Sequence, residues 1–190
     1  MTTVPPEHFD RLFGSGPDPY GFRTRWYERR KYALTLAVLS RPRYARGLEV
    51  GCAEGALTEQ LAGRCDRLDA VDGSGVAVER AARAMAAHPE VHVSRAVVPG
   101  ELPPGPYDLV VLSEVGYFLS AADLDRLAAR ITAALAPGGE LAAVHWRHPS
   151  DLYPLTGDEV HERLDAEPRL DPLTRLVEPD VVMTTYRVQP

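Results

Sequence analysis

The residues best able to do chemistry lie where a predicted strand passes into a helix. LEVGCAEGALT, residues 48–58, reads Glu49-x-Gly51-x-x-x-Gly55. Gly51 lets the backbone turn sharply and lets a ligand approach without a Cβ in the way, while free N–H groups at the helix start form a polar edge. A second predicted strand ends in Asp72, about twenty residues on, where a carboxylate can accept hydrogen bonds from both hydroxyls of a ribose. The two features together predict a nucleoside site.

Two other interpretations of this turn compete with a single-nucleoside site. A dinucleotide site favours G-x-G-x-x-G, but Ala53 occupies the second glycine position and Glu54 would repel a pyrophosphate. A nicotinamide cofactor is therefore disfavoured. The turn could also be purely structural, with Asp72 only capping the helix that follows it.

A second group of reactive side chains follows two later strands. The fourth predicted strand ends in Ser113 and Glu114 and leads to Tyr117, and the fifth ends in His145. Ligands gather at the carboxyl ends of strands in an open α/β sheet, so these side chains should converge. A carboxylate or a neutral imidazole can act as a general base, which makes Glu114, His145 and Tyr117 the catalytic candidates. Glu114 could instead bond a neighbouring helix or the cofactor, and His145 could simply be packed at a strand end.

Strands and helices alternate along most of the chain. The expected strands are 47–51, 67–72, 91–96, 107–114 and 140–147, and the expected helices between them are 56–65, 76–88 and 121–136. Thr156 is a candidate cap for a further short helix, and residues 172–178 and 181–188 read as a terminal hairpin. This order predicts an α/β fold with a doubly wound, mostly parallel seven-stranded sheet and an N-terminal helical cap.

The first forty residues are expected to form that cap. Residues 24–40 fit a helix that follows a turn-rich loop, residues 14–22. Trp26 and Tyr27 could fold over a cofactor as a lid, or could be core contacts of this helix. One arginine of the run at 23, 25, 29 and 30 could meet a cofactor carboxylate. We expect one domain over residues 1–190, with the cap or lid at 1–40 and the core at 47–190.

Composition excludes several classes of protein. The net charge of −6 and the pI near 5.5 disfavour a nucleic-acid binder. No apolar run is long enough to span a membrane and no leader is recognisable, so a cytoplasmic protein is expected. The spacing of His145, His148, Asp151 and His161 fits no familiar metal site, so no metal is expected.

These residues resemble the class I S-adenosylmethionine-dependent methyltransferases, whose first motif is an acidic residue, x, Gly, three residues and Gly. DPYGFRTRWYERRKYALTL, LEVGCAEGALTEQLAGRCDRLDAVD and YDLVVLSEVGYFL resemble the nodulation N-methyltransferase (NodS-like) branch over residues 8 to 165. The resemblance implies S-adenosylmethionine as cofactor, with Glu49, Gly51 and Gly55 around its methionine part and Asp72 on its ribose. Further residues assigned to the cofactor are Val97 against the adenine, Ser113 and Tyr27.

The resemblance also implies an activity. We expect methyl transfer to a small-molecule acceptor, most simply an amine such as an aminosugar or a secondary-metabolite intermediate. Members of the branch methylate a glucosamine amine exposed by a deacetylase, so functional pairing with a deacetylase is also expected. The alternatives are an O-methyltransferase acting on a small hydroxyl or carboxyl acceptor, and a non-catalytic protein that only binds S-adenosylmethionine.

Overall fold

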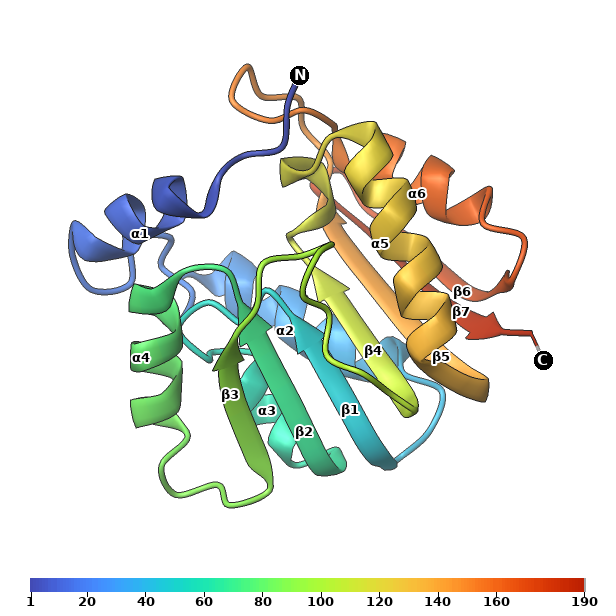
Figure 1. The fold of residues 1–190 in the computed structure, drawn as a ribbon, viewed down its shortest axis with the longest axis horizontal. Helices are drawn as coiled ribbons and strands as arrows, with labels where there is room; N and C mark the ends of the chain where they lie inside the picture. Colours follow the sequence, from blue (N-terminus) through green and yellow to red (C-terminus); the bar gives the residue numbers. More distant parts are fainter. Residues whose placement is uncertain (190) are drawn as a thin grey trace.

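A single seven-stranded sheet runs through the structure, which is a computed structural model describing residues 1–189 (Figure 1). The strand order is β3-β2-β1-β4-β5-β7-β6, and every neighbouring pair is parallel except β5 with β7 and β7 with β6. The strands are β1 (Tyr44–Val50), β2 (Cys65–Asp72), β3 (Val91–Arg95), β4 (Tyr107–Ser113), β5 (Leu135–Trp146), β6 (Leu170–Val177) and β7 (Val181–Val188). The predicted seven-stranded, doubly wound sheet is confirmed, and the last two strands form the expected antiparallel hairpin.

The centre of the sheet is apolar on both faces. Leu109 to Leu112 in β4 are fully buried, as expected for a parallel strand covered on both sides by helices. β1 pairs with β2 and β4, with Val50 opposite Val71 and Leu112. This register brings the carboxyl ends of the three strands to one edge of the sheet, which is where the functional residues lie.

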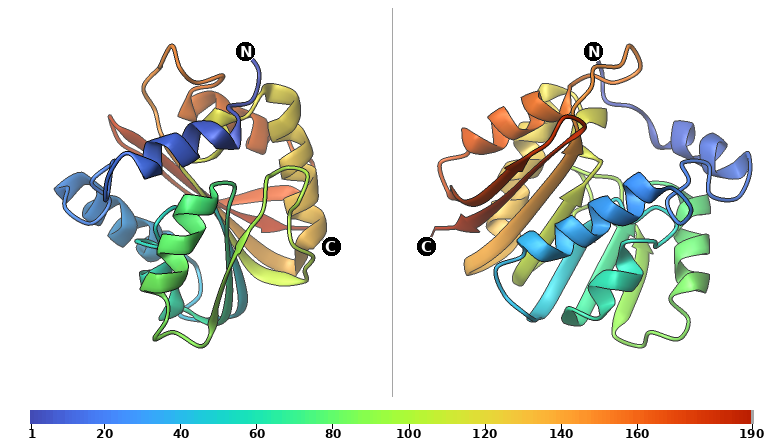
Figure 2. Two further views of the ribbon diagram at one scale, coloured as in Figure 1. Left: turned by 60° about the vertical axis from the view of Figure 1, so that its left-hand side comes forward. Right: turned by 180° about the vertical axis from the view of Figure 1, so that it is seen from behind.

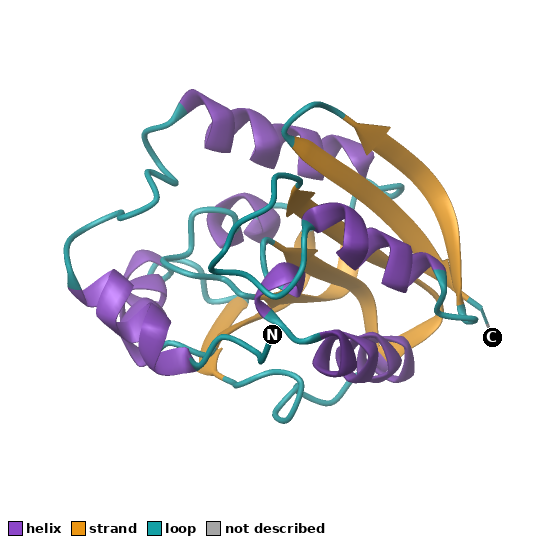
Figure 3. Ribbon diagram, turned by 90° about the horizontal axis from the view of Figure 1, so that it is seen from above, coloured by secondary structure: helices purple, strands orange, loops and turns teal. Residues whose placement is uncertain are grey.

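Helices cover both faces of the sheet (Figures 2 and 3). α2 (Trp26–Val38) and α3 (Thr58–Ala62) lie on one face, while α5 (Ala121–Ala134) and α6 (Gly157–Asp165) lie on the other. α4 (Gly75–Ala84) packs against β2 and β3. A short 3₁₀ turn, η1 (Gly116–Phe118), follows β4. The predicted cap of α6 is confirmed, because the Thr156 side chain and Glu159 form a reciprocal capping box.

The first forty residues divide between two places. α1 (Pro6–Gly14) lies beyond the carboxyl ends of the strands next to α4, whereas α2 packs on a face of the sheet (Figure 1). Asp10 in α1 accepts a 2.6 Å hydrogen bond from the Ser74 hydroxyl, and Val4 N–H donates to Phe118 O over 2.8 Å. α1 is thus tied to both sides of the sheet edge that it crosses.

Several helices are shorter than predicted; α4, for example, ends at Ala84 and not at residue 88. α3 covers only Thr58–Ala62, because Arg64 donates to the carbonyl oxygens of Leu36 and Pro42 and β2 already begins at Cys65. α5 ends at Ala134 and not at residue 136, because Leu135 pairs with Tyr107 of β4 and so already belongs to β5. The Pro-Gly-Gly segment therefore belongs to β5, where the register against β4 shifts between Tyr107 and Leu109.

Candidate functional site

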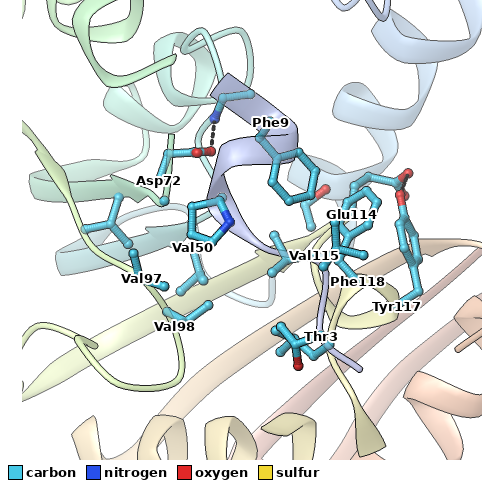
Figure 4. A pocket seen from close by; sticks show the side chains of 18 of the residues that line it. Thr3, Phe9, Val50, Asp72, Val97, Val98, Glu114, Val115, Tyr117 and Phe118 are labelled. Carbon is cyan, nitrogen blue, oxygen red and sulfur yellow. Dashed lines mark hydrogen bonds between the residues drawn. The ribbon is translucent and has the colours of Figure 1, made fainter. Parts of the chain in front are cut away.

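A cleft lies at the carboxyl ends of β1, β2 and β4 (Figure 4). Val50 and Val71 line it from the sheet, and Phe9 of α1 lines it from the other side. Asp72 lies at one side of the cleft and Glu114 with Tyr117 at the other, with Val50 between them (Figure 4). The carboxyl edge of an open α/β sheet is the expected place for a ligand, and we call this cleft the pocket.

The turn after β1 depends on glycine. Gly51 has φ +81°, and a Cβ there would lie 2.1 Å from Val115 Cγ2. The Gly51 N–H donates to Val71 O over 2.7 Å, which holds the turn against β2. Ala53 also has a positive φ of 47°, uncommon for a residue with a Cβ. The two positive φ values thus mark a sharp turn that requires glycine at position 51.

Asp72 is oriented by two backbone amides. Its Oδ2 accepts from Ala53 N–H over 2.9 Å and its Oδ1 accepts from Ser74 N–H over 2.8 Å. Burial raises the pKa of Asp72, and these hydrogen bonds offset part of that effect. A carboxylate has about four lone-pair sites, so each oxygen can still accept a hydrogen bond from a ligand. Asp72 lines the pocket.

The wall beside Asp72 is apolar. Val97 and Val98, in the segment that follows β3, line the pocket together with Ala96 (Figure 4). Val97 N–H donates to Glu101 Oε2 over 2.8 Å, which keeps that segment in place. Apolar side chains suit the faces of a purine ring. The structure therefore brings Gly51, Asp72, Val97 and Ser113 to one pocket.

Three other residues assigned to the cofactor do not line the pocket. Glu49 is buried behind the turn, where its Oε2 has no hydrogen-bond partner within residues 1–189, and burial raises its pKa to about 7. Gly55 has φ +83° and lets the chain approach Ala81 of α4. Tyr27 places its hydroxyl 3.4 Å from Asp180 O. Trp26 is 70% exposed, so neither aromatic residue folds over the pocket.

Glu114 and Tyr117 form a hydrogen-bonded pair in the pocket. Glu114 Oε2 accepts from the Tyr117 hydroxyl over 2.8 Å, and Oε1 accepts from Trp146 N–H over 2.8 Å. Glu114 has φ +60°, an unusual backbone conformation that aims its side chain while its N–H bonds Val144 O. Burial raises the pKa of Glu114, with Lys31 acting in the opposite sense. Burial also raises the pKa of Tyr117, so its hydroxyl keeps its proton.

His145 lies behind this pair and not in the pocket wall. Its Nε2 lies 3.1 Å from Gly116 N–H and must accept from it, so the proton of the neutral ring is on Nδ1. Nδ1 then donates to His161 Nε2 over 3.1 Å, and His161 Nδ1 donates to Thr184 Oγ1 over 2.9 Å. Burial lowers the pKa of His145 well below its usual value. Both ring nitrogens are engaged, so the geometry gives His145 a supporting place and not that of a base.

Two residues of α2 reach the pocket region without having been predicted. Glu28 lines the pocket, and Lys31, the only lysine of the chain, is 2% exposed beneath it. Lys31 Nζ lies 2.9 Å from Glu28 Oε2 and 3.5 Å from Glu114 Oε2. That Lys31 is the only lysine in an arginine-rich chain was the sequence signal that could have pointed to a role for this helix in the site.

Aromatic side chains from three distant segments enclose the Glu114 side of the pocket. Phe118 packs against Phe9 of α1, with ring centroids 4.8 Å apart, and against Tyr153, at 4.7 Å. Tyr153 also stacks on Tyr117 at 5.2 Å with an interplanar angle of 17°. Aromatic faces attract cations and pack on apolar ring faces, so this side suits a cationic or ring-shaped ligand.

The charge of the pocket favours a cation. Among the described residues that line it, Glu28, Asp72 and Glu114 carry carboxyl groups and none is lysine, arginine or histidine. Two of the arginines considered as partners of a cofactor carboxylate form ion pairs away from the pocket. Arg23 pairs with Glu59 at 2.7 Å, and Arg30 pairs with Glu178 at 2.5 Å. A sulfonium nucleoside fits these residues: Asp72 for a ribose, Val97 and Val98 for a base, and carboxylates for positive charge.

Two further features concern the chain as a whole. Within residues 1–189 there is no helix with the length and apolar character needed to cross a bilayer. Over the same residues, His, Cys, Asp and Glu side chains form no group of three or more that could hold a metal ion.

The chain is similar to several known proteins. Residues 14–143 match the family described as nodulation protein S (NodS). Nodulation protein S of Rhizobium tropici is 36% identical over 128 residues, 65% of this chain and 53% of that protein, so the chain spans about half the length of the curated relatives it matches.

Two solved structures are also similar. A putative methyltransferase from Pseudomonas syringae is 44% identical, with a TM-score of 0.77 over 86% of this chain and 99% of that one. The N-methyltransferase NodS of Bradyrhizobium japonicum WM9, solved with S-adenosyl-L-homocysteine, is 24% identical, with a TM-score of 0.86 over 97% of this chain and 98% of that one. The fold is thus the Rossmann-like fold of class I methyltransferases. By its sequence, the chain belongs to the nodulation protein S (NodS) family.

Proposed function

We propose that this protein is an S-adenosylmethionine-dependent methyltransferase that methylates the nitrogen of a small amine. The observation that carries the proposal is Asp72, held by two backbone amides at the end of β2 and facing an apolar pocket beside the Gly51 turn. Membership of the NodS family supports it. So does the solved NodS N-methyltransferase of the same fold, which holds S-adenosyl-L-homocysteine.

The cofactor supplies an electrophilic methyl group on a sulfonium. In the proposal, Asp72 binds the ribose hydroxyls, Val97 and Val98 contact the adenine, and Gly51 and Ser113 lie along the methionine part. Glu49 and Gly55 do not line the pocket, so we assign them a role in supporting the turn from behind and not in contacting the cofactor. The apolar walls exclude water, which leaves the acceptor as the available nucleophile.

The acceptor amine is proposed to meet Tyr117 and Glu114. An amine attacks only when its nitrogen lone pair is free, so an ammonium must first lose a proton. Tyr117 oxygen can accept a hydrogen bond from the amine while its hydroxyl donates to Glu114 Oε2. The proton then passes through the phenol to a carboxylate whose pKa is raised by burial, which suits a base working near neutral pH. We infer that Tyr117 aligns the amine and Glu114 takes its proton.

The pocket also bears on the other acceptor classes. Three carboxyl groups and no lining cation within the described residues repel a carboxylate acceptor. A protein that only binds the cofactor would fill the acceptor space with its own side chains, but Trp26 is 70% exposed and Trp146 does not line the pocket. The aromatic side near Tyr153 therefore remains available to an acceptor.

Four wider proposals accompany the proposed amine acceptor, of which an aminosugar is one example. Deacetylation of an N-acetyl sugar frees such an amine, so a deacetylase acting before this enzyme is consistent with it. We place both activities in the cytoplasm, with no nucleic acid involved. We also propose that residues 1–190 act as one domain, because one sheet spans Tyr44 to Val188.

The test is a calorimetric titration with S-adenosylmethionine, S-adenosylhomocysteine and NAD, repeated with Asp72→Ala. We expect saturable binding of the first two ligands and none of NAD. Loss of two charge-assisted hydrogen bonds predicts that Asp72→Ala weakens binding by at least about a hundredfold. Asp66→Ala, which removes an exposed carboxylate paired with Arg43, is the matched control and should bind as wild type does. Unchanged binding by Asp72→Ala would contradict the proposed site.

A further inference from the structure

A buried lysine stands behind two carboxylates of the pocket. Glu28 and Lys31 lie three residues apart in α2, and Glu114 follows β4. Lys31 Nζ lies 2.9 Å from Glu28 Oε2 and 3.5 Å from Glu114 Oε2, and it also lies 5.1 Å from the ring centroid of Tyr27. Only the carboxylates reach the pocket, because Lys31 is 2% exposed and does not line it.

The two carboxylates differ in how the protein satisfies them. Both oxygens of Glu114 accept well-aligned hydrogen bonds, from Tyr117 and from Trp146 N–H. Glu28 has a side chain that is only 9% exposed, and its Oε2 is buried against Lys31 Nζ at 2.9 Å. Lys31 occupies that oxygen, so Oε1 is the atom of Glu28 that can meet a donor group of a ligand in the pocket.

The charges do not balance within the protein. One ammonium faces two carboxylates, and no other cation lines the pocket in the described chain. Charged groups in a site shielded from water interact more strongly than exposed ones, so the surplus negative charge attracts a cation. The group that best matches Glu28 is an ammonium, which has up to three N–H donors and a positive charge.

We propose that Glu28 binds the ammonium group of a ligand in this pocket. Lys31 is the positioning residue, because its ammonium pairs with both Glu28 and Glu114 and keeps the two carboxylates in place. The inference rests on the proposed function, which offers two sources of that ammonium. One is the amino-acid end of the cofactor, and the other is the acceptor amine before it loses its proton. Glu28 thus adds a recognition residue from α2 to a site otherwise built by the carboxyl ends of the strands.

The two sources are separated by ligands that differ in the ammonium. S-adenosylhomocysteine carries the amino-acid end, whereas 5′-methylthioadenosine has the same nucleoside thioether without it. Glucosamine carries an amine and N-acetylglucosamine does not, and both can be titrated with the cofactor site saturated by S-adenosylhomocysteine. The variant is Glu28→Gln, which keeps the shape of the side chain and removes its charge.

Calorimetry then gives distinct outcomes. A loss of about tenfold or more for S-adenosylhomocysteine, with 5′-methylthioadenosine unchanged, assigns Glu28 to the cofactor ammonium. A loss of the same size for glucosamine alone assigns it to the acceptor. Equal losses for S-adenosylhomocysteine and 5′-methylthioadenosine, or no loss for any ligand, overturn the inference. If the wild-type protein binds neither nucleoside, the proposed function fails first and this inference with it.

Glu178→Gln is the matched control. It also removes the charge of a glutamate paired with α2, here through Arg30, but the pair lies outside the pocket. Its ligand affinities should equal those of the wild type. A loss in Glu178→Gln as large as in Glu28→Gln would mean that any weakened ion pair of α2 disturbs the site, which would overturn the inference.

The role of Lys31 has a readout of its own. Because Lys31 is the only lysine, protein labelled with [¹⁵N]lysine gives one side-chain ammonium signal. The ligand whose affinity depends on Glu28 should shift this signal in the wild type, and its partner ligand without the ammonium should shift it much less. An identical shift with both ligands of a pair would overturn the positioning role.

Discussion

The hydroxyl of Tyr117 donates a 2.8 Å hydrogen bond to Glu114 Oε2, at the side of the pocket away from Asp72 (Figure 4). Glu114 is the residue just after β4, and Tyr117 lies in the 3₁₀ turn that follows. Two neighbours in sequence thus present one phenol and one carboxylate to the same space. Such a pair can hold an acceptor and move its proton without any covalent intermediate.

Tyr117→Phe removes the phenol oxygen and keeps the ring stacked on Tyr153. We expect kcat for methyl transfer to an amine to fall by about a hundredfold or more, the usual range for losing a proton-transfer group. Binding of S-adenosylhomocysteine, measured by calorimetry, should change little because Asp72 is untouched. Tyr186→Phe is the control, since it breaks a similar 2.9 Å bond to Asp165 outside the pocket. Full activity in Tyr117→Phe would rule out the relay.

Buried His161 should make stability depend on pH. Burial lowers its pKa to about 4 in the folded protein, while an unfolded histidine titrates near its ordinary value of 6.5. Below pH 6.5 the unfolded chain takes up a proton that the folded chain rejects, so the free energy of unfolding falls as the pH drops toward 4. The contribution of His161 over this range is about 3 kcal/mol.

Glu49 changes the free energy of unfolding with pH in the opposite sense. The contribution of His161 is therefore isolated by subtracting the stability of a His161 variant from that of the wild type at each pH. The folded pKa of Glu49, about 7, makes the fold bind a proton before the unfolded chain does as the pH falls. Urea unfolding of His161→Gln and of wild type should therefore be compared from pH 7.5 to pH 4. The wild type should lose about 3 kcal/mol relative to the variant, whereas exposed His148→Gln should follow the wild type. Parallel curves for His161→Gln and wild type would show that His161 is not a buried neutral histidine.

Gly51→Ala should destabilise the fold and the site together. The alanine would have to adopt φ +81°, and its Cβ would lie 2.1 Å from Val115 Cγ2. Backbone strain and the displaced side chain predict a loss of about 2–4 kcal/mol in the free energy of unfolding, measured by urea titration. Nucleoside binding should weaken as well, because Val115 lines the pocket. Gly75→Ala, where a Cβ meets nothing within 4 Å, is the control and should be neutral.

Patterns that are local in the chain were sufficient to predict the sheet. Apolar runs such as Leu109 to Leu112 and the helical stretches between them specify the order of strands and helices, and Thr156 with Glu159 marks a helix start. Helix ends were harder to predict, as α3 and α5 show. Arg64 bonds carbonyl groups that precede β1, and Leu135 pairs with Tyr107, so both ends depend on partners distant in sequence. The position of α1 over the pocket also depends on remote partners, Ser74 and Phe118.

The site divides in the same way. The sequence alone was sufficient to single out Gly51 and Asp72, which the structure places in the pocket. A turn that needs a positive φ and an acidic residue at a strand end both have signatures within a few residues. Only the tertiary structure decided that His145 is enclosed by Gly116 and His161, and that Lys31 stands behind Glu114. Burial and charge pairing are properties of three-dimensional neighbourhoods, and they decide which titratable group is neutral, which is paired and which is free to meet a ligand. Residue type and spacing carry no record of those neighbours.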